Sequence, residues 1–281
     1  MRNVICSAFA VLLVLCAPAP RLMAAESSEN FRQRASTVDE VDKSDITEEV
    51  RFGREVAARI IARYGLYDNP QMMKYVNLVG QSLALSTNRP EIEFHFAVLN
   101  TDEINGYAAP GGYVFVTRGA IAKMKDESEL AGVLAHELGH IVEKHVVKEL
   151  NIKGMDQSAA TGLAMIIGGS TEAGRTAFAQ AADQAMDVLF KNGYKREDET
   201  QADRDAALFC ALAGYGPDGL VHFFERINAM KDRKTEVLDK THPSYETRIA
   251  WIKGTITQEG LDSGSFKNNK ERFAENVRQL K

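Results

Sequence analysis

The most constraining feature of the sequence is a pair of histidines four residues apart, His136 and His140, in the motif HELGH. Apolar periodicity predicts one long helix over about residues 127–150, and Asp126 followed by Glu129 is typical of a capping box at its start. Four residues turn an α-helix by about 400°, so both imidazoles lie on one face, about 6 Å apart along the axis.

Two imidazoles in this arrangement can bind one zinc ion. Glu137 lies beside them and can reach a metal-bound water as a general base. The alternative is a helix that carries two surface histidines. Because composition alone would produce the three-residue pattern in roughly 1% of such chains, we interpret it as a hydrolytic metal site.

A catalytic zinc site also needs a third protein ligand and an open fourth position. A histidine ten residues after His136 would indicate a metzincin, but Val146 occupies that position, so this class is excluded. His145 comes nine residues after His136, which is a rotation of about 900° along one continuous helix. We therefore expect His145 on the opposite helix face and interpret it as a non-ligand.

A carboxylate from a later helix is the remaining option for the third ligand. Glu199 and Asp203 lie four residues apart on a helix predicted over 197–213, so they share a face. One carboxylate can bind zinc, and the other can accept the second N–H of a ligand imidazole. Two solvated helix charges are the alternative, and Glu197 and Asp198 are rival ligands. Only the first pair offers a ligand and its supporting partner together.

The rest of the pattern predicts many helices and two short strands. Alternating apolar residues predict strands around Phe94–Val98 and at Tyr113–Thr117, with a turn-rich loop at 105–112 between them. Helical spacing predicts a helix that ends at Gly65, a helix that opens at Asn69-Pro70, helices over about 183–191, 197–213 and 217–231, a helical stretch within 241–254, and a peripheral helix in a charged tail at about 264–281.

The first 25 residues have the pattern of a secretory signal peptide. Arg2 precedes an apolar run, Val4–Ala17, which is followed by prolines and small residues. An uncleaved anchor is the alternative, but about 14 apolar residues are too few for a membrane span of roughly 20. Cys16 lacks the small preceding residue of a lipobox, so lipidation is not expected.

Composition bounds the rest of the chain, which has 281 residues. With 44% hydrophobic and 26% charged residues it is typical of a globular protein, and a net charge of −5 gives no electrostatic case for nucleic-acid binding. We expect a flexible lead-in at 26–45 and a single domain at 46–281. Removal of residues 1–25 would leave Cys210 as the one cysteine, so no intramolecular disulfide is expected.

Several motifs together resemble the M48 family of zinc metallopeptidases. They are HELGH at 136–140 and Glu199-x-x-Ala-Asp203. The segment NGYAAPGGYVFVTRG at 105–119 resembles the family's NAFALPGG-type loop and following strand, although Gly106-Tyr107 replaces the usual Ala-Phe, a departure that we expect to leave the metal chemistry untouched. Thr241-His242-Pro243 with Arg248 resembles the THP-x-x-x-x-R segment. The resemblance runs from about residue 46 to 253.

The resemblance implies an α+β, zincin-like fold that is mostly helical, with a small mixed sheet packed on the motif helix. It implies one Zn²⁺ per chain, held by His136, His140 and Glu199. Glu137 would act as general base, and Asp203 would support a ligand imidazole.

Further roles follow from the same resemblance. Tyr113, Val114, Phe115 and Val116 would form the active-site edge strand, whose backbone could pair with an extended substrate. His242 would lie near the metal, where it could occupy the open position and hold the enzyme latent. Arg248 could orient the loop that carries His242, or it could stabilise negative charge that develops during the reaction.

By resemblance, the function would be that of a periplasmic zinc endopeptidase acting on misfolded or unassembled envelope proteins, without required membrane association. Its partners would be polypeptide substrates, with outer-membrane assembly machinery as a further candidate and no nucleic acid. The alternative is a zinc-containing chaperone or assembly factor with little proteolysis, which Glu137 disfavours because binding alone needs no base. A structural zinc module is disfavoured by the open coordination that three ligands leave.

Overall fold

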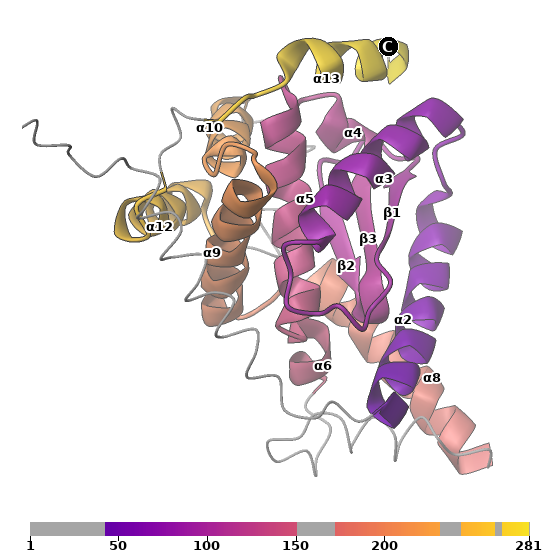
Figure 1. The fold of residues 1–281 in the computed structure, drawn as a ribbon. Coiled ribbons are helices and arrows are strands. Elements are labelled where there is room, and N and C mark those ends of the chain that lie inside the picture. The colour runs from indigo at the N-terminus through magenta and orange to yellow at the C-terminus, as the bar shows by residue number, and fades with distance from the viewer. Residues whose placement is uncertain (1–42, 151–171, 231–242, 262–265, 281) are drawn as a thin grey trace, which may run out of the picture.

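The computed structural model describes residues 43–150, 172–230, 243–261 and 266–280 (Figure 1). The predicted signal peptide at 1–25, nearly all of the predicted lead-in and His242 lie outside these ranges. Within the described ranges, no helix is both long enough and apolar enough to cross a membrane.

The sheet has three strands, β1 (His95–Leu99), β2 (Gly106–Ala109) and β3 (Tyr113–Thr117), in the order β1-β3-β2. β1 pairs with β3 in parallel and β2 pairs with β3 antiparallel. The short helix η1 (Pro110–Gly112) reverses the chain between β2 and β3, and its two glycines have φ of 69° and 102°, which side chains rarely adopt. The predicted small mixed sheet is confirmed.

One prediction about this sheet is wrong. The strand with Tyr113, Val114, Phe115 and Val116 is paired on both sides, so it is the central strand and not an edge. β2 lies at the edge of the sheet. The expected edge role came from the family resemblance. The apolar run itself indicates burial of the strand's faces and carries no information about hydrogen bonding along its edges.

Helices make up most of the described chain. They are α2 (Lys43–Tyr64), α3 (Pro70–Ala84), α4 (Arg118–Ile121), α5 (Glu127–Val142), α6 (His145–Glu149), α8 (Glu172–Asp187), η2 (Val188–Asn192), α9 (Arg196–Ala213), α10 (Gly219–Met230), α12 (Tyr245–Gln258), α13 (Lys270–Val277) and η5 (Arg278–Leu280). Figure 1 shows α5 between the sheet and α9. The predicted α+β architecture, with the sheet packed on the motif helix, is therefore confirmed.

The motif helix α5 begins as its sequence predicts. The Asp126 side chain caps it, with Oδ1 accepting a hydrogen bond from the Glu129 N–H at 3.1 Å, while Glu129 reaches back to the N–H of Lys125 at 2.9 Å. These contacts satisfy backbone donors that every helix start leaves open.

The end of α5 differs from the prediction of one helix to residue 150. α5 stops at Val142, and Lys144 takes a left-handed conformation with φ of 55°. A new helix, α6, then starts at His145 in a different direction. Nothing in the apolar periodicity marks this break, because Val146 and Val147 continue an apolar pattern and are also buried.

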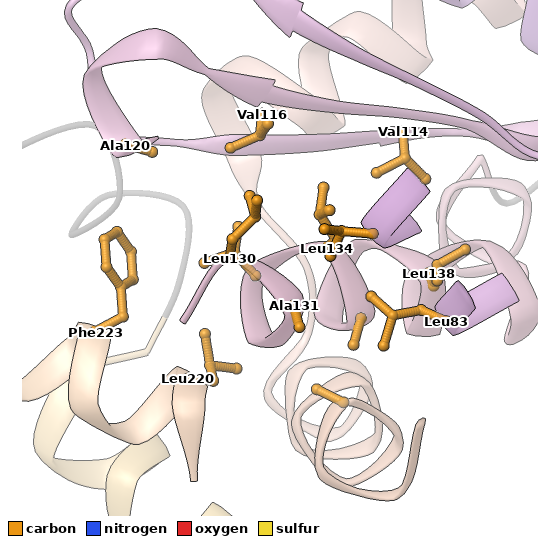
Figure 2. Close-up of a cluster of buried hydrophobic side chains, with 14 of the residues drawn as sticks. Leu83, Val114, Val116, Ala120, Leu130, Ala131, Leu134, Leu138, Leu220 and Phe223 are labelled. Carbon is orange, nitrogen blue, oxygen red and sulfur yellow. The ribbon is translucent and has the colours of Figure 1, made fainter. Parts of the chain in front are cut away.

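The core lies on both sides of α5. Figure 2 shows Val114 and Val116 of β3 facing Leu130 and Leu134 of α5. From the other side, Leu220 and further residues of α10 pack against the same helix. Because nearly every residue of α5 is buried, the helix is held in a fixed position for the side chains described next.

The C-terminal tail does more than the predicted peripheral helix would. Phe273 of α13 is 2% exposed and its ring lies 6.5 Å from that of Tyr75. Arg272 pairs with the fully buried Glu127 at the start of α5, and Glu127 also accepts hydrogen bonds from Tyr75 and Asn269. α13 thus fastens the N-terminal end of the motif helix.

Candidate metal centre

Three side chains from two helices converge on one point. His136 and His140 come from α5, and their Nε2 atoms lie 3.0 Å apart. Glu199, in the first turn of α9, places Oε2 3.7 Å from Nε2 of His136 and Oε1 3.6 Å from Nε2 of His140. All three are buried. The structure thus brings together the three residues predicted as metal ligands.

The distances between these three pairs of ligand atoms fit a single small cation. Tetrahedral zinc with bonds of about 2.0–2.1 Å to nitrogen and oxygen places its ligand atoms about 3.3 Å apart. Among the described residues, this is the His/Cys/Asp/Glu group whose ligand atoms all lie within 4.8 Å of one another. Two imidazoles and a carboxylate are a donor set that zinc prefers.

A close approach of two helices makes this convergence possible. A Cβ atom at Gly139 of α5 would lie 3.0 Å from Cα of Ala202 in α9, which is tighter than most real contacts. Ala202 itself is fully buried. The small residues within HELGH and ExxAD therefore let the two helices touch. The sequence analysis assigned them no role, although both motifs contain them.

Asp203 and Arg248 hold the first ligand. Asp203 Oδ1 lies 3.1 Å from Nδ1 of His136 and can accept its N–H, so the lone pair stays on Nε2, and Nη2 of Arg248 lies 3.0 Å from that nitrogen. Arg248, from α12, donates Nε–H to Oδ2 of Asp203 at 2.9 Å and Nη2–H to Oδ1 at 2.6 Å. The placement of Asp203 agrees with its predicted support of a ligand imidazole. Arg248 contacts Asp203, whereas His242, whose loop it was predicted to orient, lies outside the described residues.

The charges of this cluster affect one another. Burial lowers the pKa of Arg248, but the carboxylates of Asp203 and Glu199 outweigh burial and raise it overall. The guanidinium also lies 4.3 Å over the ring of Phe224. Burial, together with the charge of Arg248, lowers the pKa of His136, so this imidazole stays neutral, as a metal ligand must be.

Glu137 projects beside the three converging residues. It is 6% exposed, and burial, reinforced by the charge of Glu199, raises its pKa to about 8. Gly106 of β2 touches it, because a Cβ there would lie 2.5 Å from Oε1 of Glu137. The replacement of the family's usual alanine by Gly106 therefore lies against the predicted base, beside the metal chemistry that we expected it to leave untouched.

A pocket opens beside Glu137. Its lining is mostly apolar and comes from Asn105, Gly106, Ala120, Val133, His136, Glu137, Leu220, Phe223, Phe224 and Arg248. An apolar group of a bound molecule could thus lie next to the carboxylate of Glu137 and the ring of His136. The sequence analysis did not find this pocket because α10 contributes much of it.

His145 does not lie where the helical rotation placed it. Because α5 ends before it, His145 turns back, and its Nδ1 lies 2.9 Å from Nδ1 of His140. The ring of Tyr194 stacks on the ring of His140, and the two ring centroids lie 4.0 Å apart. The prediction of an opposite helix face is wrong. The metal-ligand group itself does not include His145.

The rival carboxylates lie away from the centre. Asp198 has Oδ1 3.5 Å from Nε2 of His145, and Glu197 is exposed. His242, the predicted regulatory ligand, belongs to a segment outside the described residues.

Comparison with known proteins agrees with the motifs. The chain is 26% identical over 242 residues to the beta-barrel assembly-enhancing protease of Escherichia coli (strain K12), covering 81% of this chain and 49% of that protein. It is 25% identical over 227 residues to Metalloprotease YcaL of the same strain, covering 79% and 83%. It is also 25% identical over 213 residues to the mitochondrial metalloendopeptidase OMA1 of Schizosaccharomyces pombe, covering 73% and 60%.

The chain spans about half the length of the beta-barrel assembly-enhancing proteases it matches. The profile of Peptidase family M48 matches residues 70–256, which contain every residue of the metal centre described above. Because this match covers well over half of the sequence, the chain belongs to peptidase family M48.

Proposed function

We propose that this chain is a zinc-dependent endopeptidase that hydrolyses peptide bonds. The observation that carries the proposal is the convergence of His136, His140 and Glu199 within 4.8 Å, with Glu137 beside them in sequence and at the edge of a pocket. Bound zinc would polarise the scissile carbonyl and lower the pKa of a coordinated water to about 7.

The chain's own residues would handle the proton. The Glu137 carboxylate would take a proton from the attacking water and pass it to the leaving amine nitrogen. Its pKa of about 8 belongs to the metal-free site, and the positive charge of a bound cation would lower it and leave Glu137 as the carboxylate that accepts a proton. Asp203 and Arg248 would keep His136 in the tautomer that binds metal, and the positive charge of Arg248 would help to neutralise the site.

Strand β2 would bind the substrate backbone. It is one of the two edge strands of the sheet, and Gly106 at its start contacts Glu137, so an extended peptide paired along β2 would pass the base. The adjoining pocket, with Val133, Phe223 and Phe224, would accept an apolar side chain of that peptide. We therefore propose β2, in place of β3, as the strand that contacts substrate.

The proposed setting is the bacterial periplasm, with residues 1–25 as a signal peptide and residues 46–281 as one peptidase domain. Misfolded or unassembled envelope proteins would be the substrates. The name of several relatives, beta-barrel assembly-enhancing protease, supports a link to outer-membrane assembly. The proposal that His242 caps the metal in a latent state also stands as a prediction.

The decisive experiment compares the wild-type chain with Glu137→Gln in cleavage of casein, with and without added zinc and a chelator. We expect the variant to retain one zinc per chain by metal analysis and to lose at least about 100-fold in cleavage rate. Glu143→Gln, at the end of α5, is the matched control and should cleave like wild type.

Two outcomes would contradict the proposal. Near-wild-type cleavage by Glu137→Gln would reject the assigned base. Binding of unfolded envelope proteins by a zinc-loaded wild-type chain that does not cleave them would favour the alternative of a chaperone or assembly factor.

A further inference from the structure

The second metal ligand has an unusual neighbour. His140 lies with Nδ1 2.9 Å from Nδ1 of His145, and the two side chains are 1% and 0% exposed. The first ligand, His136, instead faces the carboxylate of Asp203. The two ligand imidazoles therefore meet different chemical groups on their far sides.

The short contact fixes the position of one proton. Two ring nitrogens 2.9 Å apart can share a hydrogen bond only if one carries a hydrogen and the other does not. As a metal ligand, His140 would keep the lone pair on Nε2, which faces His136 and Glu199. Its hydrogen is therefore on Nδ1, which donates to Nδ1 of His145.

The same reasoning assigns the tautomer of His145. Since its Nδ1 accepts, its own hydrogen is on Nε2, which faces the carboxylate of Asp198 at 3.5 Å. The order is thus His140 to His145, and the carboxylate of Asp198 at the start of α9 lies beyond it, outside hydrogen-bond geometry. The reversal at Lys144 is what brings His145 into this order, since a continuous helix would point it away.

From this geometry we propose that His145 is a positioning residue that fixes the tautomer and the ring angle of His140 as a metal ligand. The proposal deepens the proposed function, because it rests on a cation bound by His140. Tyr194 supports the same ring from its face, with an interplanar angle of 17°. A flip of the His140 ring would lose its hydrogen bond to His145 and turn a carbon toward the cation.

Substitutions of His145 can show whether this histidine only fills space or accepts a hydrogen bond. Asparagine can place its Oδ1 acceptor near the position of histidine Nδ1, glutamine places its polar group farther out, and leucine has similar bulk without an acceptor. The series His145→Asn, His145→Gln and His145→Leu therefore separates packing from acceptance. His222→Asn, at an exposed histidine of α10, is the matched control.

The experiment measures zinc affinity by competition with a chromophoric chelator, and the thermal midpoint of each metal-free variant. We expect His145→Leu and His145→Gln to bind zinc about 10- to 100-fold more weakly than wild type. His145→Asn should stay within a few-fold of wild type, and His222→Asn should match it. When cobalt replaces zinc, the visible spectrum of His145→Leu should differ from that of wild type, whereas the spectrum of His145→Asn should match it.

Equal zinc affinity in wild type and His145→Leu would overturn the positioning role. The role would also be overturned if His145→Asn bound zinc as weakly as His145→Gln while both metal-free variants unfolded at the same temperature. Should the leucine variant fail to fold, the comparison of asparagine with glutamine decides. Zinc binding without casein cleavage would overturn only the proposed function, whereas a wild-type chain that binds no zinc would overturn both proposals.

Discussion

Glu137 is held in surroundings that oppose its charge. It is nearly buried, it lies near the carboxylate of Glu199, and only Arg248 among the nearby charges lowers its pKa. The result is a pKa raised from 4.5 to about 8 in the metal-free site. In that state the folded protein holds a proton on Glu137 that the unfolded chain would release.

This proton makes the stability of the metal-free protein depend on pH. Because the folded pKa is the higher one, the contribution of Glu137 is present below pH 4.5 and is lost as the pH rises through 8. Because glutamine does not titrate, the Glu137→Gln variant does not lose stability in this way as the pH rises. We expect the metal-free variant to gain on the order of 3 kcal/mol over wild type between pH 5 and pH 9.

The measurement is chemical denaturation of both chelator-treated proteins at several pH values. The comparison of variant with wild type cancels the opposite effect of His136, whose lowered pKa costs stability at acid pH. A difference between the two proteins that stays constant from pH 5 to pH 9 would show that Glu137 is ionised throughout.

At the scale of single residues, the sequence predicts those side-chain placements that local helix geometry determines. The rise and turn of a helix place His136 beside His140, and the same rule pairs Glu199 with Asp203. It fails for His145, because one left-handed residue, Lys144, ends the helix to which the rule was applied. A lysine in that conformation has no distinctive sequence signal.

Among elements, the contact of α5 with α9 has the largest effect on the site. Gly139 and Ala202 meet at this contact, so any larger side chain must separate the two helices. A separation would move Glu199 away from both imidazoles, because the carboxylate is carried by α9 and the histidines by α5.

We therefore expect Gly139→Val to reduce stability by about 2 kcal/mol through overpacking and to weaken zinc binding at least about 10-fold. Gly254→Val is the control, because a Cβ at this α12 glycine meets nothing within 4 Å. Thermal unfolding and chelator competition measure the two effects. If both valine variants bind zinc like wild type, the close approach does not set the ligand geometry.

Element order in the sheet could not be predicted from the sequence. The pattern at Tyr113–Thr117 indicates a buried strand, and the strand is buried. Its central place follows from pairing with β1 on one side and with β2 on the other, and the apolar pattern of a strand carries no information about either partner. The edge strand β2 has only four residues, and its sequence reads as a turn-rich loop, so its pairing was not expected.

Considered as a whole molecule, the chain uses its C-terminal part to hold its centre. α12 supplies Arg248, and α13 covers the start of α5, where Glu127 is fully buried. A buried carboxylate needs its partners, because an unpaired charge in the interior is costly. Arg272 is the one cation that the structure pairs with Glu127 among the described residues.

Removing this cation should weaken the whole fold. We expect Arg272→Ala to lower the free energy of unfolding by about 1–2 kcal/mol, a reduced value because the arginine is itself largely exposed. Denaturant unfolding measures the loss, and Arg278→Ala at the exposed residue of η5 is the control. Equal stability of the two alanine variants would mean that Tyr75 and Asn269 satisfy Glu127 by themselves.

The position of Arg248 has a consequence for biosynthesis. Its guanidinium is the partner of the buried Asp203, yet it follows the histidine motif by more than a hundred residues. A ribosome must therefore synthesise α12 before the buried carboxylate of Asp203 can meet its cation. Until then the histidine motif and Asp203 are present in a nascent polypeptide that still lacks their supporting guanidinium.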